Sequence, residues 1–472
     1  MLFHSPEFLS LMAMALVAYL FFPRARITIL AVANAFFYGV AGLPWLALFA
    51  GMAWLTYYCS LRVNRRHGRL FLWLGCAANL LNLGFFKYTN FIISNLPVEL
   101  VAGLIGDRVL HVALPIGISF YTFQLMAYLI DVARDEVAPA RSFAEFWVFI
   151  AFFAQLIAGP IMRARDFMPQ IARSATIRVR SGQFKYGLYV LFVGLTKKVL
   201  LADTLAPLAD KLFAGAPGLT PAQVWIASAL FAFQIYFDFS AYSDMAVGIG
   251  HLFGYGLTQN FFTPYISSGP TEFWRRWHVT LSTWIRDYIY IPLGGSRVPL
   301  PRQAANIIIA MTLSGLWHGA SWTFVIWGLY HGLLSAAEKY YRRYLESRLP
   351  ERLRRSRAYS GLQIVAWNAL ILIGWVFFRI SEFRVALSLV RRMVLPTSLA
   401  FSLGDALLLC LTAGLYALHW LERWVRDHEF ALHDAWRRSV PTPLRGLAYA
   451  ALVVVVVVFM KLQTSAFIYF RF

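Results

Sequence analysis

The sequence predicts an all-α, polytopic integral membrane protein. Hydrophobic residues make up 59% of its 472 residues and charged residues 14%, whereas soluble proteins carry about 25% charged residues. Apolar runs long enough to cross a bilayer as helices recur along the chain. We therefore expect about 11 or 12 transmembrane helices, with additional re-entrant or interfacial helices, because only helices satisfy the backbone of such runs in lipid. No linker sets off a soluble part, so a single membrane-embedded domain over residues 1–472 is predicted.

The net charge of +20 comes from short Lys and Arg clusters between the apolar runs. Such clusters are typical of cytoplasmic loops beside anionic lipid headgroups, and we do not expect nucleic-acid binding. Cys59, Cys76 and Cys410 stand in apolar sequence without metal-ligand spacing, so neither a disulfide framework nor a metal site is indicated. The N-terminus lacks a basic stretch, which favours an uncleaved first span over a signal peptide.

In the first part of the chain, basic clusters suggest an orientation. Arginines follow the first and third apolar runs, whereas residues 41–44, between the second and third runs, carry no charge. The positive-inside rule therefore places the N-terminus outside the cytoplasm. Residues 97–105 are too short a run to cross, and we expect them to be re-entrant or interfacial. Spans are predicted at residues 7–22, 27–40, 44–60, 70–83, 114–130 and 146–159, the fourth extending toward residue 93.

The later part of the chain contains an unusually long apolar run at residues 224–252. Inside it, Gln234 and Asp238 are one helical turn apart, as are Ser240 and Asp244. Buried carboxylates need partners, and three arginines are candidates: Arg275, Arg276 and Arg286. Both a structural hydrogen-bond network and a proton path are open at this point. Further spans are predicted at residues 186–201, 362–378, 403–420 and 447–460.

A central stretch carries the two candidate histidines His278 and His318, and its first part, residues 272–295, has helical periodicity. One stripe of the helix is apolar, with Phe273, Trp277, Leu281, Trp284 and Tyr288. The opposite stripe is polar, with Arg275, His278, Ser282 and Arg286. The polar stripe is what an interfacial helix requires, and it also suits an anionic ligand such as a phosphate-bearing acyl donor. Both interpretations stay open.

The second part of the central stretch, residues 313–332, is apolar but contains His318. An ionisable group at this depth usually faces a protein interior or a water-filled path. Gly315 and Gly319 leave room for close approach of a backbone or ligand, and Ser314 and Ser321 are expected on the histidine's face of the helix. A buried structural histidine is the alternative to a general base that accepts a proton from a hydroxyl. The sequence contains no GxSxG, P-loop, HExxH or dinucleotide motif.

These motifs resemble the membrane-bound O-acyltransferase superfamily, and most closely its bacterial branch. That branch contains the alginate O-acetylation membrane protein and the D-alanyl-lipoteichoic acid transfer protein. The similar segments cover most of the chain: LPIGISFYTFQ at 114–124, AGP at 158–160, FDFSAYSDMAVGIG at 237–250, FWRRWHVTLSTWIRDYIYIPLGG at 273–295, LWHGASWTFVIWGLYHG at 316–332 and FIYFRF at 467–472. The amino-acid sequences of the first and last segments favour the alginate type over the D-alanylation type.

The resemblance implies a fold with a central tunnel, in which His318 is the family's essential histidine. His278 then corresponds to the second recurrent histidine, with Arg286 and Asp287 in the same motif. It implies a protein of the bacterial inner membrane that takes an acyl group from a cytoplasmic thioester, with acetyl-coenzyme A as the expected donor and no bound cofactor. The acyl group would pass to an exported acetyltransferase partner of the polysaccharide-synthesis machinery.

The expected reaction is acetyl transfer, with His318 as general base or, alternatively, as a short-lived acyl-histidine. Arg275 and Arg286 would meet donor phosphates, while Trp317 and Trp322 would wall the site against water. Acyl transfer to teichoic acid, peptidoglycan or lipid remains an alternative. A polysaccharide or solute transporter, in which the histidines line a path, is the alternative from another class.

Overall fold

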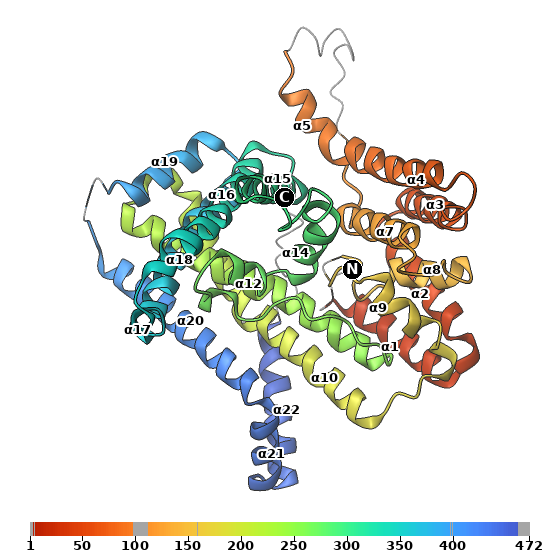
Figure 1. Cartoon of the computed structure of the whole chain (residues 1–472). Coiled ribbons are helices and arrows are strands. Elements are labelled where there is room, and N and C mark those ends of the chain that lie inside the picture. Colours follow the sequence, from red (N-terminus) through yellow and green to blue (C-terminus); the bar gives the residue numbers. More distant parts are fainter. Residues whose placement is uncertain are drawn as a thin grey trace. The chain divides into compact units, whose positions relative to one another are not determined.

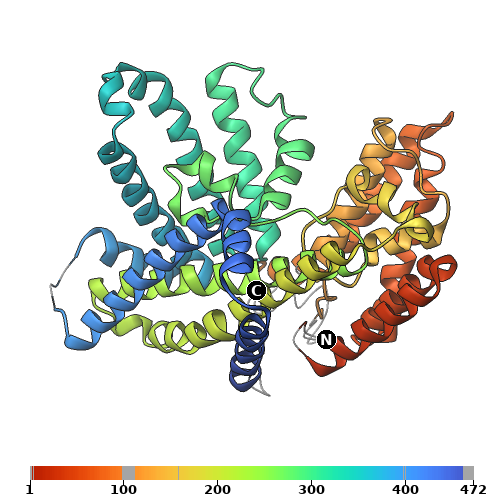
Figure 2. The ribbon, with the colours of Figure 1, turned by 90° about the horizontal axis from the view of Figure 1, so that it is seen from below.

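The computed structural model describes residues 3, 5–97, 112–157, 159–396, 398 and 400–460. Every regular element in these residues is a helix, and Figures 1 and 2 show no strand among them. The predicted all-α class is therefore confirmed. The predicted re-entrant piece beyond residue 97 and the motif at 467–472 lie outside the described residues. The chain packs as two compact units, which are described in turn.

The first unit comprises Met1–Gly194 and Tyr242–Gln259. Helix α1 begins where the Ser5 hydroxyl accepts a hydrogen bond from the Phe8 amide, and Ser142 caps α8 in the same way. Both caps satisfy amides that lack a partner within the helix. The helices of this unit are α1 (Pro6–Phe21), α2 (Arg26–Gly39), α3 (Leu43–Ser60), α4 (Gly68–Leu83), α5 (Thr89–Ser94), α7 (Ile118–Ala133), α8 (Phe143–Ala151), α9 (Ala164–Ile171) and most of α10 (Ser181–Thr196).

The second unit comprises Leu195–Ala241 and Asn260–Phe472. It holds α11 (Asp203–Ala214), most of α12 (Pro221–Leu252), α13 (Pro270–Trp274), α14 (Val279–Ile285), α15 (Leu300–His318), α16 (Trp322–Tyr344), α17 (Glu351–Arg354), α18 (Arg357–Arg379), α19 (Phe383–Val394), α20 (Leu403–Asp427), α21 (Glu429–Ser439) and α22 (Thr442–Phe459). The pair α21 and α22 projects from this unit in Figure 1. The single-domain prediction stays a prediction, because two packing units can belong to one domain.

Five helices in the described residues are long and apolar enough to cross a membrane, or six if the bent pair Pro6–Phe21 and Pro23–Gly39 is one span. This is fewer than the eleven or twelve crossings predicted from the sequence. Several predicted spans form helices that fall short of the length needed to cross alone, including α1, α2, α7 and α10. The residues of the predicted span at 146–159 leave the helix after Ala151. A multi-pass membrane protein is confirmed, and its number of crossings stays a prediction.

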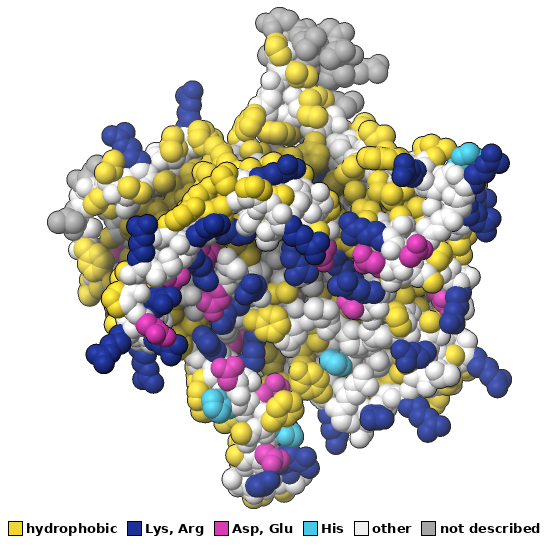
Figure 3. Space-filling view, in the orientation of Figure 1, with side chains coloured by type: hydrophobic (Ala, Val, Ile, Leu, Met, Phe, Trp, Pro, Cys, Tyr) yellow, Lys and Arg dark blue, Asp and Glu magenta, His cyan; other side chains and the backbone are white. Residues whose placement is uncertain are grey.

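The candidate spans differ in how much of their surface the protein covers. Helix α12 is 94% buried over its apolar window, whereas α22 is 6% buried. A helix that is hydrophobic all round is either packed within protein or faces lipid. Thus α12 is a core helix, and α22 presents nearly its whole apolar surface outward. Figure 3 shows Lys and Arg side chains gathered over the region of α17, where the exposed arginines include Arg352, Arg354 and Arg355.

Candidate active site

His318 lies at the end of α15, where two helices approach closely. The following residue, Gly319, is extended with φ −160° and ψ 151°, and this conformation ends α15. A Cβ on Gly315 would overlap the carbonyl oxygen of Phe324, and one on Gly319 would overlap the Phe324 ring. Both positions therefore require glycine for the contact between α15 and α16. The close approach predicted at these glycines is made by the protein itself.

The His318 imidazole is buried among aromatic rings. Its ring centroid lies 5.0 Å from that of Trp317, 5.1 Å from Trp327 and 5.3 Å from Phe378, all in edge-on arrangements. Only 5% of the residue is exposed. These rings come from α15, α16 and α18, so three helices fix the position of one titratable side chain. Such a site restricts water around the imidazole.

His278 does not lie on the wet face of a single helix, and that sequence prediction is wrong. The segment is broken into α13, α14 and a π-helical turn at Arg286–Tyr290, and His278 is the residue that precedes α14. It is buried, with a left-handed backbone at φ 42°. Of the predicted apolar stripe, Phe273, Trp277, Leu281 and Trp284 are buried as expected, whereas Tyr288 is partly exposed.

Asn260 holds the backbone and side chain around His278. The Asn260 carboxamide oxygen lies 3.3 Å from Nδ1 of His278 and accepts hydrogen bonds from the amide and hydroxyl of Thr280 at 3.1 and 3.0 Å. The Val279 amide donates to the Asn260 carbonyl at 3.0 Å. A left-handed non-glycine residue costs free energy and persists only where its surroundings enforce it. These contacts supply that enforcement.

Trp317 lies between His278 and His318. Its ring centroid is 5.0 Å from that of His318 and 6.1 Å from that of His278. The Phe239 ring of α12 meets His278 from another side, edge-on at 4.7 Å. The structure thus brings His278, Trp317 and His318 into one buried aromatic site within the second unit. The sequence placed these residues in one stretch but did not show that they meet.

The two arginines and the serine that were predicted on one stripe with His278 differ in their exposure and in their contacts. Arg275 and Arg286 are exposed, and Arg286 Nε lies 2.7 Å from Oδ1 of Asp287. Ser282 donates to the Trp277 carbonyl at 3.2 Å. Arg275 and Arg286 are thus available at the surface, and His278 is not on their stripe.

Ser314, Ser321 and Trp322, which were predicted around His318, also differ in their position and exposure. Ser314 is buried one turn before His318 on α15. Ser321 is not on that helical face as predicted, because the chain leaves the helix after His318; it precedes α16, with its hydroxyl 2.8 Å from that of Thr323. Trp317 is buried, whereas Trp322 is 55% exposed.

The carboxylate of Asp238 has a lysine as its partner and not one of the predicted arginines. Lys198 Nζ lies 2.7 Å from Asp238 and 2.9 Å from Asp203. Arg276 and Arg286 instead pair with acids close to them in sequence. The buried charges therefore form an ion-pair network between α12 and the turn before α11, which fits the structural alternative. Asp244 lies farther along α12, in the first unit.

Glu272 at the start of the central stretch is held as a carboxylate. It accepts hydrogen bonds from the amide and hydroxyl of Ser268 at 2.9 and 2.8 Å, and Arg276 lies 2.7 Å away. Partial burial raises the pKa of this carboxyl, but the Ser268 hydrogen bonds and the Arg276 cation outweigh it and hold the pKa below its usual value. The pair fixes α13 to the loop that precedes it.

Comparison with known proteins identifies the class of this site. The family model of the membrane-bound O-acyltransferases matches residues 45–381, which include both histidines. The chain belongs to the membrane-bound O-acyltransferase family. It is an O-acyltransferase, which decides against the transporter alternative.

Two of the relatives of this O-acyltransferase match most of the chain, and a third matches less than half of it. It is 38% identical to the probable alginate O-acetylase AlgI of Pseudomonas putida, over 90% of this chain and 86% of that protein. It is 36% identical to the peptidoglycan O-acetyltransferase of Helicobacter pylori, over 77% of this chain and 73% of that protein. The teichoic acid D-alanyltransferase of Streptococcus thermophilus is 31% identical over 46% of this chain and 55% of that protein. The alginate type is thus more similar than the D-alanylation type.

The O-acyltransferase site also contains residues that the sequence interpretation missed. Asn260, Trp327 and Phe378 contact the two histidines from segments outside their motifs or farther along them. A third buried histidine, His331, lies 4.8 Å from Trp327 between ring centroids. Its position inside an apolar helix was a usable signal, because ionisable residues there are rare. Asn260 gave no such signal, since asparagine is common in loops.

In the described residues, no group of three or more His, Cys, Asp and Glu side chains is arranged to hold a metal ion.

Proposed function

We propose that this O-acyltransferase takes an acetyl group from a thioester on the cytoplasmic side of the bacterial inner membrane. It passes the group across the membrane for O-acetylation of an exported polysaccharide. The observation that carries the proposal is the meeting of His278 and His318 on Trp317 in a buried site. The relatives named as alginate and peptidoglycan O-acetylating proteins support an acetyl group over other acyl groups.

In the proposed reaction His318 acts as the general base. Its imidazole accepts the proton of an acceptor hydroxyl, whose oxygen attacks the thioester carbonyl. The carbon–sulfur bond then breaks, and the thiolate leaves with the proton returned by His318. The products are an acetyl ester and a free thiol. Direct attack by the imidazole, with a transient acetyl-histidine, remains the alternative.

His278 has a supporting role in this proposal. Its ring is fixed by Asn260 and by the aromatic contacts of Phe239 and Trp317. The exposed Arg275 and Arg286 are proposed to bind the phosphates of acetyl-coenzyme A, because one guanidinium group can donate two parallel hydrogen bonds to phosphate oxygens. The proposal also requires a water-accessible path that brings the thioester carbon to His318.

The acceptor on the outer side is proposed to be an exported acetyltransferase partner that esterifies sugar hydroxyls of an alginate-type polymer. Peptidoglycan is a second candidate polymer, because a peptidoglycan O-acetyltransferase is 36% identical over most of this chain. The N-terminus is proposed to lie outside the cytoplasm, from the arginine clusters that follow the first and third helices.

Substitution of His318 tests the proposal. Since general-base catalysis contributes about 10²–10⁴ in rate, His318→Gln should nearly abolish acetylation of the polymer while protein abundance stays unchanged. His433→Gln, at an exposed position of α21, is the matched control and should be neutral. Polymer acetylation is measured by mass spectrometry of the polysaccharide from cells carrying each variant. Normal acetylation in His318→Gln cells would remove this residue from the mechanism.

The same cells identify the polymer. Exopolysaccharide, peptidoglycan and lipid extracts are compared with and without the gene. Loss of acetyl groups from exopolysaccharide alone supports the alginate-type proposal. Loss from peptidoglycan favours the second candidate, and loss from lipid would contradict both.

A further inference from the structure

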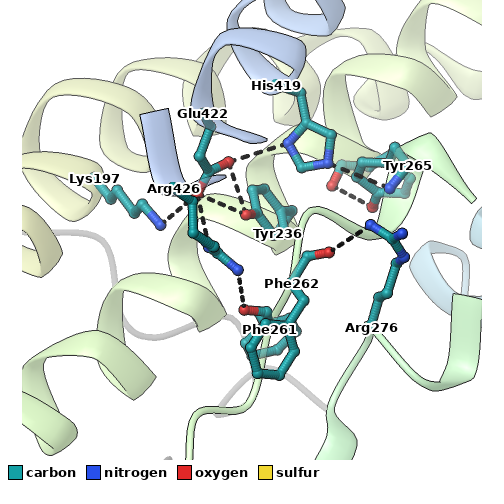
Figure 4. A network of polar contacts seen from close by, with 10 residues as sticks. Lys197, Tyr236, Phe261, Phe262, Tyr265, Arg276, His419, Glu422 and Arg426 are labelled. Atoms are coloured by element: carbon teal, nitrogen blue, oxygen red, sulfur yellow. Dashed lines mark hydrogen bonds and ion pairs between the residues drawn. The ribbon is translucent and has the colours of Figure 1, made fainter. Parts of the chain in front are cut away.

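A partly buried ionic cluster surrounds Glu422 near the C-terminal end of α20 (Figure 4). We call Lys197, Tyr236, His419, Glu422 and Arg426 the Glu422 cluster. The Glu422 carboxylate lies 2.7 Å from Lys197 Nζ, accepts hydrogen bonds from the Tyr236 hydroxyl at 2.8 and 2.9 Å, and lies 3.5 Å from Arg426. His419 Nδ1 is 3.2 Å from the same carboxylate. One acid thus joins α20, α12 and the π-helical turn Lys197–Ala202.

The Glu422 cluster holds a loop of the second unit by its backbone. Arg426 donates to the carbonyl of Phe261 at 2.9 Å, and the amide of Tyr265 donates to Nε2 of His419 at 3.3 Å (Figure 4). From α18, Asn368 donates to the carbonyl of Tyr265 at 2.8 Å. Few backbone groups of this loop form hydrogen bonds within a helix. The side chains of Arg426, His419 and Asn368 therefore supply hydrogen-bond partners that these backbone groups would otherwise lack.

The loop held in this way is the one that fixes His278. Asn260, next to Phe261, accepts the hydrogen bonds from Val279 and Thr280 and lies beside His278 Nδ1. The Phe262 amide donates to the carbonyl of Arg276 at 2.9 Å. Both segments of this contact contain a left-handed non-glycine residue, Thr263 at φ 46° and His278 at φ 42°. A conformation of this kind depends on the neighbours that enforce it.

The hydrogen bond from Tyr265 also determines the tautomer of His419. Because the Tyr265 amide is a donor, Nε2 of His419 is the acceptor, and the ring proton is then on Nδ1. Nδ1 faces Glu422, whose carboxylate favours a proton there. In Glu422→Gln, the side-chain amide can turn its NH₂ group toward Nδ1, which opposes this tautomer. The carboxylate, which can only accept a hydrogen bond, therefore favours the tautomer that keeps the contact to Tyr265.

Resting on the proposed function, we infer that Glu422 is a positioning residue for His278. It orients His419 and Arg426, these hold Phe261 and Tyr265, and the loop from Asn260 to Tyr265 holds the backbone on both sides of His278. Helix α20 follows the residues matched by the family model, which end at 381. The cluster therefore adds support to the family's histidine site from a helix outside the matched part.

Hydrogen–deuterium exchange of the full-length protein in nanodiscs tests the inference directly. Glu422→Gln should raise the exchange rate about tenfold or more at the amides of Phe262, Tyr265 and Val279. Exchange at these amides requires local opening of the loop, and loss of the carboxylate lowers the free energy of that opening. Arg426→Gln, which removes the contacts of Arg426 to Phe261, Phe262 and Glu422 but keeps the Glu422 carboxylate and His419, is the second variant in case the first folds poorly. Asp434→Asn is the matched control, since it breaks an exposed ion pair with Arg438 on α21.

Kinetics with acetyl-coenzyme A provide the second measurement. For Glu422→Gln we expect kcat to fall about tenfold with KM within about twofold, as for loss of an interaction that acts in the chemical step. Unchanged exchange at the three amides would overturn the inference, as would an activity loss that only follows the loss of folded protein. If the wild-type chain transfers no acetyl group, the proposed function is wrong, and exchange alone then decides the positioning role.

Discussion

At the scale of single residues, the site is made by histidines whose surroundings come from distant parts of the chain. His318 has aromatic neighbours from α16 and α18, and His278 is fixed by Asn260 from the preceding loop. The residue types and their order were visible in the sequence. Their partners were not, because periodicity within one segment says nothing about a loop or helix that packs on it.

Glu272 provides a residue-scale prediction on pH. Its pKa is lower in the folded protein than in the unfolded chain, so the ionised form stabilises the fold above the unfolded value of about 4.5. This contribution is lost as the pH falls through the folded pKa. Glu272→Gln should therefore have a flatter dependence of unfolding temperature on pH below about 4.5. Unfolding curves in detergent between neutral and acidic pH measure it, and parallel curves for both proteins would contradict it.

At the scale of elements, the central stretch shows why a helical pattern can predict burial and still miss geometry. The apolar stripe at 273–284 is buried as predicted. The helix is nevertheless interrupted at His278, because backbone groups there bond to Asn260 and Phe262 and not along the helix. Similarly, the predicted span at 403–420 continues to Asp427. Its charged end is accommodated because Glu422 and Arg426 find partners in the Glu422 cluster.

The contact between α15 and α16 gives a prediction at this scale. Gly315→Ala places a methyl group against the Phe324 carbonyl and within 2.9 Å of Gly328. Overpacking of this kind costs about 1–3 kcal/mol, so the unfolding temperature and acetyl transfer should both fall. Gly361→Ala in α18 is the control, because its Cβ would have no neighbour within 4 Å. That change should be neutral or stabilise by about 0.5–1 kcal/mol. Equal effects of both substitutions would contradict the packing argument.

At the scale of the whole molecule, composition predicted the all-α membrane class, which is confirmed, whereas the number of crossings stays a prediction. Apolar runs determine that helices form, and most predicted bounds differ from the observed ones by few residues, as for residues 7–22 and α1. A run does not determine whether its helix crosses alone. The helix in the predicted span at 146–159 ends at Ala151. The Phe153 amide there donates a hydrogen bond to the side chain of Asn34. This partner is remote in sequence and could not be read from the run itself.

Labelling of introduced cysteines tests the predicted crossings. In a cysteine-free background, Ala41→Cys should react with an impermeant thiol reagent from outside the cell, and His67→Cys only after the membrane is opened. The two positions flank α3, and arginines follow it, which predicts that its C-terminal end faces the cytoplasm. Reaction of both cysteines from the same side would show that α3 does not cross the membrane.

The hydrogen bonds between α20 and the loop before His278 limit how short such an enzyme can be. A chain ending after α19 would retain all residues from 45 to 381 that define the family. It would lack His419 and Arg426, the two side chains of α20 that grip Phe261 and Tyr265. On the proposed positioning role, such a truncation would carry every signature motif and still turn over slowly, so the minimal catalyst extends well past the family signature.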